Sequence, residues 1–235
     1  MKYKTLIRLF LLGLFTSGTL LSTIKAQDTE TRPIPDIITS IKVTSGLDLY
    51  ITQGDKVSLE IEAEKGYLHR VITEVKGHQL RIYTEGRINW KRTVLPKIYV
   101  TLPDLKSVTS SGGSDVFTKS TVKTDSLVLN ASSGSDMYME VDTKKLALNS
   151  SSGSDLKVKG KTIYLTASAG SGSDIIAEDL AAKYVTVKTS AGSDARVYAI
   201  ESIDAHASSG SDIIVYGSPI KKNLKESSGG DIREK

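Results

Sequence analysis

The chain has 235 residues, no cysteine and a formal net charge of +4 at pH 7. The absence of cysteine excludes disulfides, thiol chemistry, zinc–thiolate sites and a lipid anchor on an N-terminal cysteine. Four basic residues and no acidic residue lie in the first 26 positions, so the remainder balances 27 basic against 27 acidic residues. This balance gives no indication of nucleic-acid binding.

The first 26 residues predict a signal peptide. Three basic residues precede a mostly apolar run, Leu9–Leu21, and Ala26 offers a small residue for cleavage. The run is short for a membrane span and is interrupted by polar residues, although a retained anchor is the alternative. We therefore expect an exported protein that is periplasmic, outer-membrane-associated or secreted, with no transmembrane segment after signal removal.

Residues 27–36 are polar and contain Pro33 and Pro35. Because proline discourages regular structure, we expect a polar lead-in here. The next segment, 37–104, holds alternating stretches that predict strands, at Val57–Ala63 and Lys97–Leu102 among others.

Two parts of this segment are less regular. Gly66–Val75 fits either a short helical turn or an irregular crossing, and Glu85–Leu95 is polar and basic, which predicts an exposed loop. Earlier, Thr44–Asp48 resembles one further copy of the repeat described next, with Leu47 in place of a serine.

A short phrase, Ser-Gly-Ser-Asp or a close variant, recurs through the second half of the chain at spacings of 18 to 21 residues. Its seven copies end at Asp115, Asp136, Asp155, Asp174, Asp194, Asp212 and Asp231. A near-constant period of this length indicates a repeat architecture. Apolar and polar residues alternate on both sides of each copy, as in Leu146 and Leu148 before the turn and Leu156 and Val158 after it. This alternation is typical of strands with one buried face.

The repeat predicts an all-β fold, a right-handed parallel β-helix or β-solenoid with rungs of about 19 residues. We expect one domain over 37–235, with regular rungs over 105–217 and an irregular, charged cap over 218–235. In the fourth copy, Leu165 lies nine residues before Asp174, which we interpret as a two-residue bulge at Gly170-Ser171 with Ile163 and Leu165 inward.

The glycines and aspartates of the repeat are expected to form structural turns. Glycine supplies a backbone conformation that other residues reach only with strain, and Asp and Ser hydrogen-bond nearby backbone. A weak ladder of bound cations or a dedicated calcium site is the alternative. Each turn supplies one carboxylate, whereas calcium prefers six to eight oxygen ligands.

Catalytic signatures are missing from the sequence. There is no Gly-x-Ser-x-Gly phrase and no His-Glu-x-x-His phrase, so we expect no catalytic residue, metal or cofactor. Some β-helices degrade polysaccharides, and Glu178, Asp179 and Glu201 are the acidic candidates for such an activity, although solvated corner charges explain them equally well.

Aromatic residues offer candidate binding positions. Tyr138, Tyr164 and Tyr198 fall on the outward phase of their strands, where they could stack on a sugar or anchor a protein. Tyrosine also simply suits strands. Trp90, the only tryptophan, lies among three basic residues of the predicted loop and could contact an acidic glycan, or could pack over the end of the solenoid.

Several of these phrases together resemble a known bacterial family. Ile41–Asp55, the strand Val57–Ala63, the phrase Val100–Pro103 and the Ser-Gly-Ser-Asp copies are similar to the family called putative auto-transporter adhesin, head GIN domain. The resemblance covers roughly Ile37–Asp231 and implies a parallel β-helix-like fold in an envelope or secreted protein of Gram-negative bacteria. The resemblance implies no catalytic residues.

These observations favour a non-catalytic, exported, adhesin-like or envelope binding protein that uses an outward strand face. Its partner would be a glycan or an envelope or host protein, and nucleic acid is not expected. The alternatives are a structural envelope protein that associates with copies of itself, as a homo-oligomer, and a β-helix enzyme that degrades polysaccharides.

Overall fold

Each copy of the repeat forms a tight turn with two consecutive residues of positive φ. In the computed structural model, which describes residues 27–86 and 95–235, Ser133 and Gly134 have φ of 57° and 68°. Such pairs are typical of the type I′ turns that join antiparallel strands. The predicted role of glycine is therefore confirmed. The residue before it adopts the same left-handed conformation, even where it is Ala191, with φ of 55°.

In four of the copies the serine after the glycine hydrogen-bonds the backbone of the turn from inside, through Ser135, Ser154, Ser173 and Ser193. Ser135 is fully buried, and its hydroxyl donates to the Ser132 carbonyl at 2.9 Å while accepting the Ser132 N–H at 3.2 Å. Ser154 makes the same two bonds to Ser151. One short side chain thus satisfies a donor and an acceptor that the turn leaves unpaired.

Seventeen strands and one short 3-10 turn account for the regular structure of the described residues. The strands before the first Ser-Gly-Ser-Asp copy are β1 (Gln27–Arg32), β2 (Ser40–Val43), β3 (Asp48–Gln53), β4 (Ser58–Glu64), β5 (Val71–Lys76), β6 (Gln79–Thr84) and β7 (Lys97–Leu102), with η1 (Leu68–Arg70) between β4 and β5. The repeated part contains β8 (Ser107–Ser111), β9 (Asp115–Thr118), β10 (Val122–Ser132), β11 (Asp136–Ser151), β12 (Asp155–Gly170), β13 (Asp174–Ser190), β14 (Asp194–Ser208), β15 (Asp212–Tyr216), β16 (Lys221–Ser227) and β17 (Asp231–Glu234).

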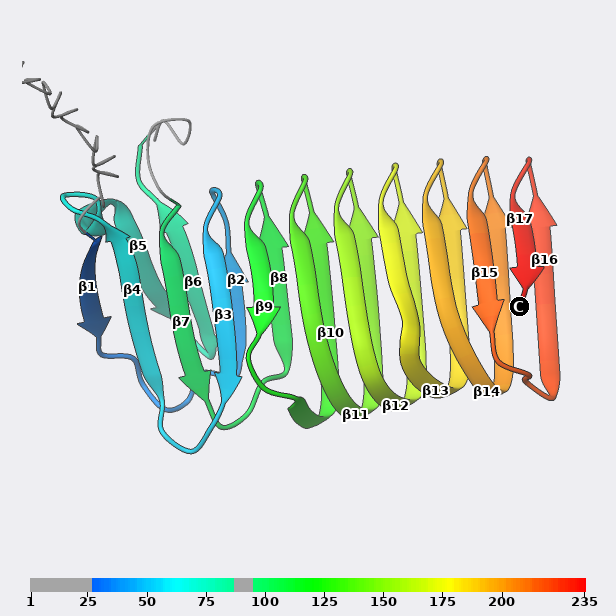
Figure 1. Cartoon of the computed structure of the whole chain (residues 1–235), viewed down its shortest axis with the longest axis horizontal. Helices are drawn as coiled ribbons and strands as arrows, with labels where there is room; N and C mark the ends of the chain where they lie inside the picture. The colour runs from blue at the N-terminus through cyan, green and yellow to red at the C-terminus, as the bar shows by residue number, and fades with distance from the viewer. Residues whose placement is uncertain (1–26, 87–94) are drawn as a thin grey trace, which may run out of the picture.

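Successive rungs stack in parallel, with equivalent residues of the repeat side by side (Figure 1). Asp136 pairs with Asp155 and Asp155 with Asp174, while Leu146 pairs with Leu165 on the other side of the coil. The strands β11 to β14 each leave one turn, bend at the opposite corner and run up to the next turn. The predicted β-solenoid with a spacing of about 19 residues is confirmed, and its right-handed winding stays a prediction.

The flattened coil has two sides, which we call the outgoing sheet and the incoming sheet. The outgoing sheet holds the strand segments that leave a turn: β3, β9, the first halves of β11 to β14, β15 and β17. The incoming sheet holds the segments that lead into a turn: β2, β8, the end of β10, the second halves of β11 to β14, and β16.

The interior between the two sheets is a column of aliphatic side chains. Leu129, Leu148 and Val187 from the incoming sheet and Val158 and Val197 from the outgoing sheet are all buried. Because no single rung holds enough apolar area to stand alone, stability is shared between neighbouring rungs.

The fourth rung corrects the sequence interpretation. Leu165 pairs with Leu146, and Ala167 pairs with Leu148, so the turn at Ser171-Gly172 has the same length as the others and contains no bulge. Ile163 is 36% exposed, because it lies at the corner where the chain changes sheets and the alternation restarts. The register of the stack, rather than the nearest apolar residue, decides which positions are equivalent.

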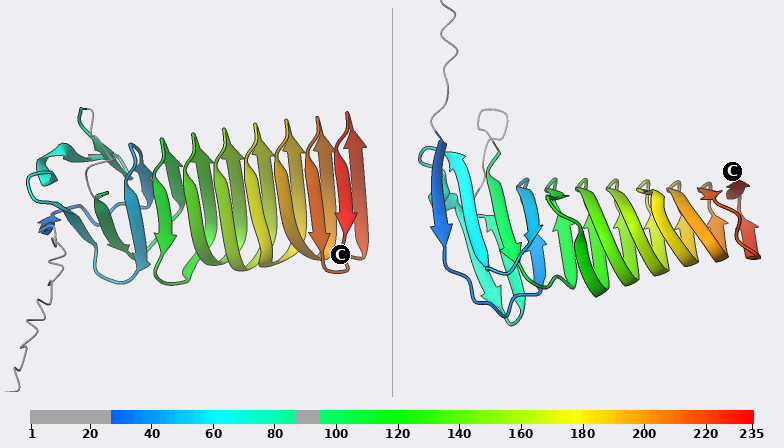
Figure 2. Two further views of the ribbon diagram at one scale, coloured as in Figure 1. Left: turned by 45° about the horizontal axis from the view of Figure 1, so that its top comes forward. Right: turned by 60° about the horizontal axis from the view of Figure 1, so that its bottom comes forward.

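The N-terminal strands extend both sheets, first by parallel and then by antiparallel pairing (Figure 2). In the outgoing sheet β7 pairs in parallel with β3, β4 pairs antiparallel with β7, and β1 pairs antiparallel with β4. In the incoming sheet β6 pairs in parallel with β2, and β5 pairs antiparallel with β6. The turn predicted at Thr44–Asp48 is present, since Ser45 and Gly46 have positive φ and Asp48 pairs with Asp115.

The expected polar lead-in, 27–36, begins instead with the strand β1. Its polar side chains alternate between exposed and half-buried, which suits a strand that only has to cover the edge of β4. Pro33 and Pro35 follow its last residue and so remove no ladder hydrogen bond from it. The ambiguous stretch Gly66–Val75 contains η1 and enters β5.

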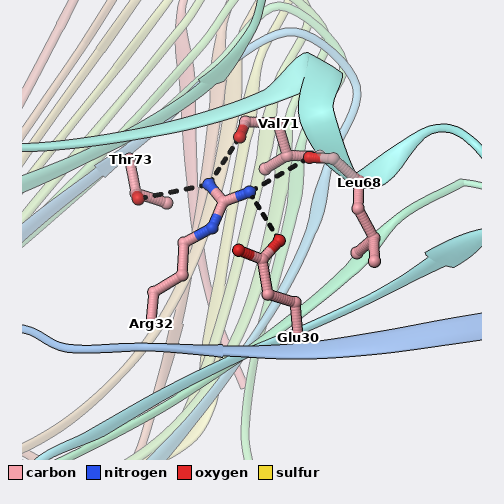
Figure 3. Close-up of polar contacts among 5 residues, drawn as sticks. All are labelled: Glu30, Arg32, Leu68, Val71 and Thr73. Carbon is pink, nitrogen blue, oxygen red and sulfur yellow. Dashed lines mark hydrogen bonds and ion pairs between the residues drawn. The ribbon is translucent and has the colours of Figure 1, made fainter.

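Arg32 joins the two sheets at this end of the molecule (Figure 3). It extends from β1 of the outgoing sheet to the start of β5 in the incoming sheet, where its guanidinium donates to the carbonyls of Val71 at 2.6 Å and Leu68 at 3.1 Å. Glu30 pairs with the same guanidinium at 2.9 Å, and this contact lowers the pKa of Glu30. The first rungs are thereby closed by a charged hydrogen-bond network.

The C-terminal residues, expected as an irregular cap over 218–235, form one more rung. β16 pairs in parallel with β14, and β17 pairs with β15, with a turn at Ser228-Gly229 between them. The charged side chains of β16 are all exposed, because no further rung covers this edge. The final copy of the repeat, Ser227–Asp231, has glycine in place of the second serine of Ser-Gly-Ser-Asp and still forms the turn.

Candidate binding grooves

Outward side chains of the stack lie in columns, because equivalent residues of successive rungs are in register. Neighbouring strands are about 4.8 Å apart, so bulky side chains in one column must contact each other. The character of a column therefore changes only where the residue type changes from one rung to the next.

One column of the outgoing sheet begins with four aromatic rings. In spatial order they are Tyr99 of β7, Tyr50 of β3, Phe117 of β9 and Tyr138 of β11, with ring centroids 5.1 to 5.2 Å apart and planes within 18° of parallel. The rings of this aromatic row face along the solenoid axis, so each inner ring is covered on both faces by its neighbours. Stacks of this kind stabilise both the sheet and the ring positions.

Contacts at the start of the row hold it in place. The Tyr99 hydroxyl donates to Glu62 at 3.1 Å, and burial together with this bond raises the pKa of Tyr99 to about 12. The ammonium group of Lys119 lies 4.4 Å from the centre of the Tyr50 ring, a cation–π contact. These rings are neutral and fixed at any physiological pH.

The row ends at Tyr138, where the next residue of the column is Lys157. A groove of about 440 Å³ opens at this point, and we call it the Tyr138 groove. Its lining consists of Phe117, Thr118, Tyr138, Met139, Glu140, Lys157, Val158, Lys159, Ile176 and Asp179. Phe117 covers one face of the Tyr138 ring, and the other face is directed toward the rung of Lys157, which also lines the groove. Tyr138 is 44% exposed, more than any other ring of the row.

Charged residues line the same groove as Tyr138. Glu140 accepts a hydrogen bond from Thr121 and pairs with Lys159 at 3.0 Å, and these contacts lower the pKa of Glu140. Burial raises the pKa of the Tyr138 hydroxyl. The groove thus combines an apolar ring face with fixed carboxylate and ammonium groups, which is a composition suited to a ring that carries hydroxyl groups.

The tyrosines predicted as binding residues lie on two sides of the molecule. Tyr138 borders the groove just described, and Tyr198 lies on the same sheet three rungs further on, outside the lining of that groove. Tyr164 lies on the incoming sheet, where it stacks on Tyr184 at 5.1 Å. Trp90 falls outside the described residues, as does the signal peptide predicted at 1–26.

Sequence reasoning missed the other members of the row, Tyr50, Tyr99 and Phe117. A signal was present, since Tyr50, Phe117 and Tyr138 each lie two positions after an aspartate of the repeat. Tyr99 follows no such aspartate, and only its pairing with β3 reveals it.

The repeated aspartates, Asp48, Asp115, Asp136, Asp155, Asp174, Asp194, Asp212 and Asp231, form a column beside the turns. The Asp136 carboxylate accepts the backbone N–H of Asp155 at 3.2 Å, and Asp194 accepts that of Asp212 at 3.1 Å. Burial, with added repulsion from Asp155 and Asp194, raises the pKa of Asp174. Backbone donors thus accommodate part of the repulsion between like charges. No group of three or more His, Asp or Glu side chains suited to a metal occurs within 27–86 and 95–235.

The acidic residues considered for catalysis lie near the corners of the coil opposite the repeat turns. Glu178 accepts a hydrogen bond from the Tyr216 hydroxyl, which raises the pKa of Tyr216. Asp179 lines the Tyr138 groove, and both residues fall where the register between β13 and β14 shifts. The Glu201 carbonyl accepts the backbone N–H of Ile220. In the part of the chain that the structure describes, no helix is long and apolar enough to cross a membrane.

Comparison with known proteins gives one family and several similar folds. Residues 38–219 match the model of the family described as putative auto-transporter adhesin, head GIN domain. The crystal structure of a putative adhesin from Bacteroides fragilis covers 90% of this chain and 98% of its own, with 24% identity and a TM-score of 0.83. A putative lipid binding protein from Parabacteroides distasonis covers 89% of this chain and 96% of its own, with 18% identity and a TM-score of 0.72. A search among curated proteins finds no match.

Proposed function

Because this chain belongs to the family of putative auto-transporter adhesins with a head GIN domain, we propose that it is a non-catalytic, exported, adhesin-like protein that binds a glycan in the Tyr138 groove. The family description and the fold shared with a putative adhesin support recognition rather than chemistry. The signal-like first 26 residues support export.

The exposed Tyr138 ring at the end of the aromatic row is the observation that carries this proposal. A pyranose ring presents C–H groups on one face, and these pack well on an aromatic ring whose position is already fixed. Glu140, Lys157 and Asp179 line the same groove and offer hydrogen-bond partners for hydroxyl groups. The row behind Tyr138 holds the ring in the orientation that binding requires, so little conformational entropy is lost.

A glycan array probed with the purified protein and with Tyr138→Ala tests the proposal. We expect Tyr138→Ala to weaken binding of the recognised glycan by about tenfold, the loss of one stacking contact of roughly 1 kcal/mol or more. Tyr198→Ala is the matched control, since Tyr198 is exposed to a similar extent on the same sheet but does not line the groove. Equal binding by Tyr138→Ala, or an equal loss in Tyr198→Ala, contradicts the proposed site.

Self-association is the second candidate. The edge strand β16 is exposed along its whole length, and Ile220 beside it is 83% exposed. A mass that rises with concentration in size-exclusion chromatography with light scattering, together with an array without signal, would favour this structural role over glycan binding.

A further inference from the structure

A second, shorter row of stacked rings lies on the incoming sheet, on the side of the coil opposite the Tyr138 groove. Five residues occupy one outward column here, in the order Lys145, Tyr164, Tyr184, Ser202 and Lys221. Tyr164 and Tyr184 stack with centroids 5.1 Å apart and planes 20° from parallel. Their rings therefore face along the axis, and the second face of Tyr184 points toward Ser202.

Ser202 leaves a gap in this row. The separation of the stacked rings matches the spacing of the rungs, so the side chain of the next rung would have to be aromatic to continue the stack. Serine is too short to reach the ring plane. A hollow of about 370 Å³ lies at this place, bordered by Tyr184, Ser202 and, one rung further on, Lys221. The fold thus provides a slot for one ring, which we call the Ser202 slot.

The adjacent outward column supplies polar groups beside the slot. Thr186, Asp204 and Asn223 line the same hollow, and the Asn223 amide donates to one oxygen of the Asp204 carboxylate at 3.1 Å. This bond fixes the carboxylate, whose second oxygen can accept from a ligand hydroxyl. The same lining holds Lys221 and Lys222, so the slot offers hydrogen-bond donors as well as an acceptor to a ring that carries hydroxyl groups.

We propose that the Ser202 slot binds a pyranose unit, stacked on Tyr184 and hydrogen-bonded by Asp204. The inference extends the proposed function, because it gives the solenoid a second glycan site on its opposite side. Two sites on opposite sheets let one molecule bridge glycan chains on two separate surfaces.

Filling the slot from within the protein provides the test. Ser202→Tyr places a third ring on Tyr184 and closes the slot, whereas Ser202→Ala leaves it open and serves as the matched control. Binding to the array glycan is measured in the Tyr138→Ala background, in which the first site is weakened and the second site contributes most of the signal. We expect Ser202→Tyr and Tyr184→Ala to remove most of the residual binding, and Ser202→Ala to retain it.

Bridging is measured separately with beads coated with the same glycan. The wild-type protein is expected to agglutinate them, while Tyr138→Ala and Ser202→Tyr each bind without agglutination. Circular dichroism spectra and melting curves confirm that each variant folds, and Ser202→Tyr should melt at or above the wild-type temperature because it lengthens a ring stack.

The two proposals fail in different ways. If Tyr138→Ala alone abolishes all binding, the Tyr138 groove stands and the Ser202 slot is refuted. If Tyr138→Ala changes nothing while Ser202→Tyr removes binding, the slot stands alone and the first site is refuted. A wild-type protein that binds no glycan overturns both.

Discussion

At the scale of single residues, glycines that share a positive φ have different roles in this protein. Gly153 sits in a repeat turn with φ of 66°, and a Cβ atom there would meet nothing within 4 Å. Gly160 lies at the opposite corner with φ of 115°, and its Cβ would approach the Val141 carbonyl oxygen of the neighbouring rung to 2.1 Å. The first glycine serves conformation alone, and the second also allows two rungs to approach each other.

This difference predicts unequal effects of alanine. Gly153→Ala should lower the free energy of unfolding by about 1–2 kcal/mol, the strain of a left-handed residue. Gly160→Ala should lower it by more than about 3 kcal/mol, because the backbones of two rungs must also separate. Urea unfolding followed by circular dichroism compares the two variants, and equal midpoints would show that the close approach at Gly160 is unimportant.

At the scale of elements, β1 is held to the molecule by more than its pairing with β4. Arg32 carries hydrogen bonds from the outgoing sheet to η1 and β5, so three elements depend on one guanidinium (Figure 3). Arg81 offers a comparison, since it is another arginine of these N-terminal strands but its contact with Glu74 spans 4.0 Å.

Removing the two guanidinium groups should therefore have different consequences. Arg32→Met keeps much of the side-chain volume but leaves the carbonyls of Val71 and Leu68 without this donor. The free energy of unfolding should therefore fall by about 1–3 kcal/mol. Arg81→Met should change stability by less than about 0.5 kcal/mol, as expected for an exposed pair. Melting temperatures measure both, and hydrogen exchange of β5 should rise only in Arg32→Met. A similar small loss in both variants would contradict the closing role of Arg32.

At the scale of the whole molecule, the solenoid is a one-dimensional stack in which each rung contacts mainly its two neighbours. Rungs in the middle are covered on both sides, whereas the rung of β16 and β17 is covered on one. In such a stack, the position of a defect decides how far its effect extends.

The same change at two positions tests this property. Val158 and Val215 are both buried and both lie three residues after a repeat aspartate, one in the middle of the stack and one in the rung before its last. Val158→Ala should lower the melting temperature and raise hydrogen exchange in several rungs on both sides. Val215→Ala should raise exchange chiefly in β15, β16 and β17. Identical exchange patterns would mean that the stack unfolds as a single unit.

The sequence alone was sufficient to predict the stacked rungs of the repeated part, because the period of the repeat determines them. A turn every 18 to 21 residues, with period-two alternation between turns, leaves stacked rungs as the arrangement that buries every aliphatic face. The inward positions around Leu148, Leu156 and Val187 were therefore correctly predicted. The exposed position of Ile163 was not predicted, because the alternation restarts at a corner and the local sequence pattern does not show where that corner lies.

The candidate sites needed the tertiary structure, because they depend on the order of the strands in space. Tyr99 lies between Tyr50 and Phe117 in the sequence, yet in the stack Tyr50 lies between the other two, since β3 pairs with β7 on one side and β9 on the other. Likewise Ser202 is an ordinary serine until its rung places it next to Tyr184. Periodicity determines which residues face outward, but only the packed rungs decide which of these meet.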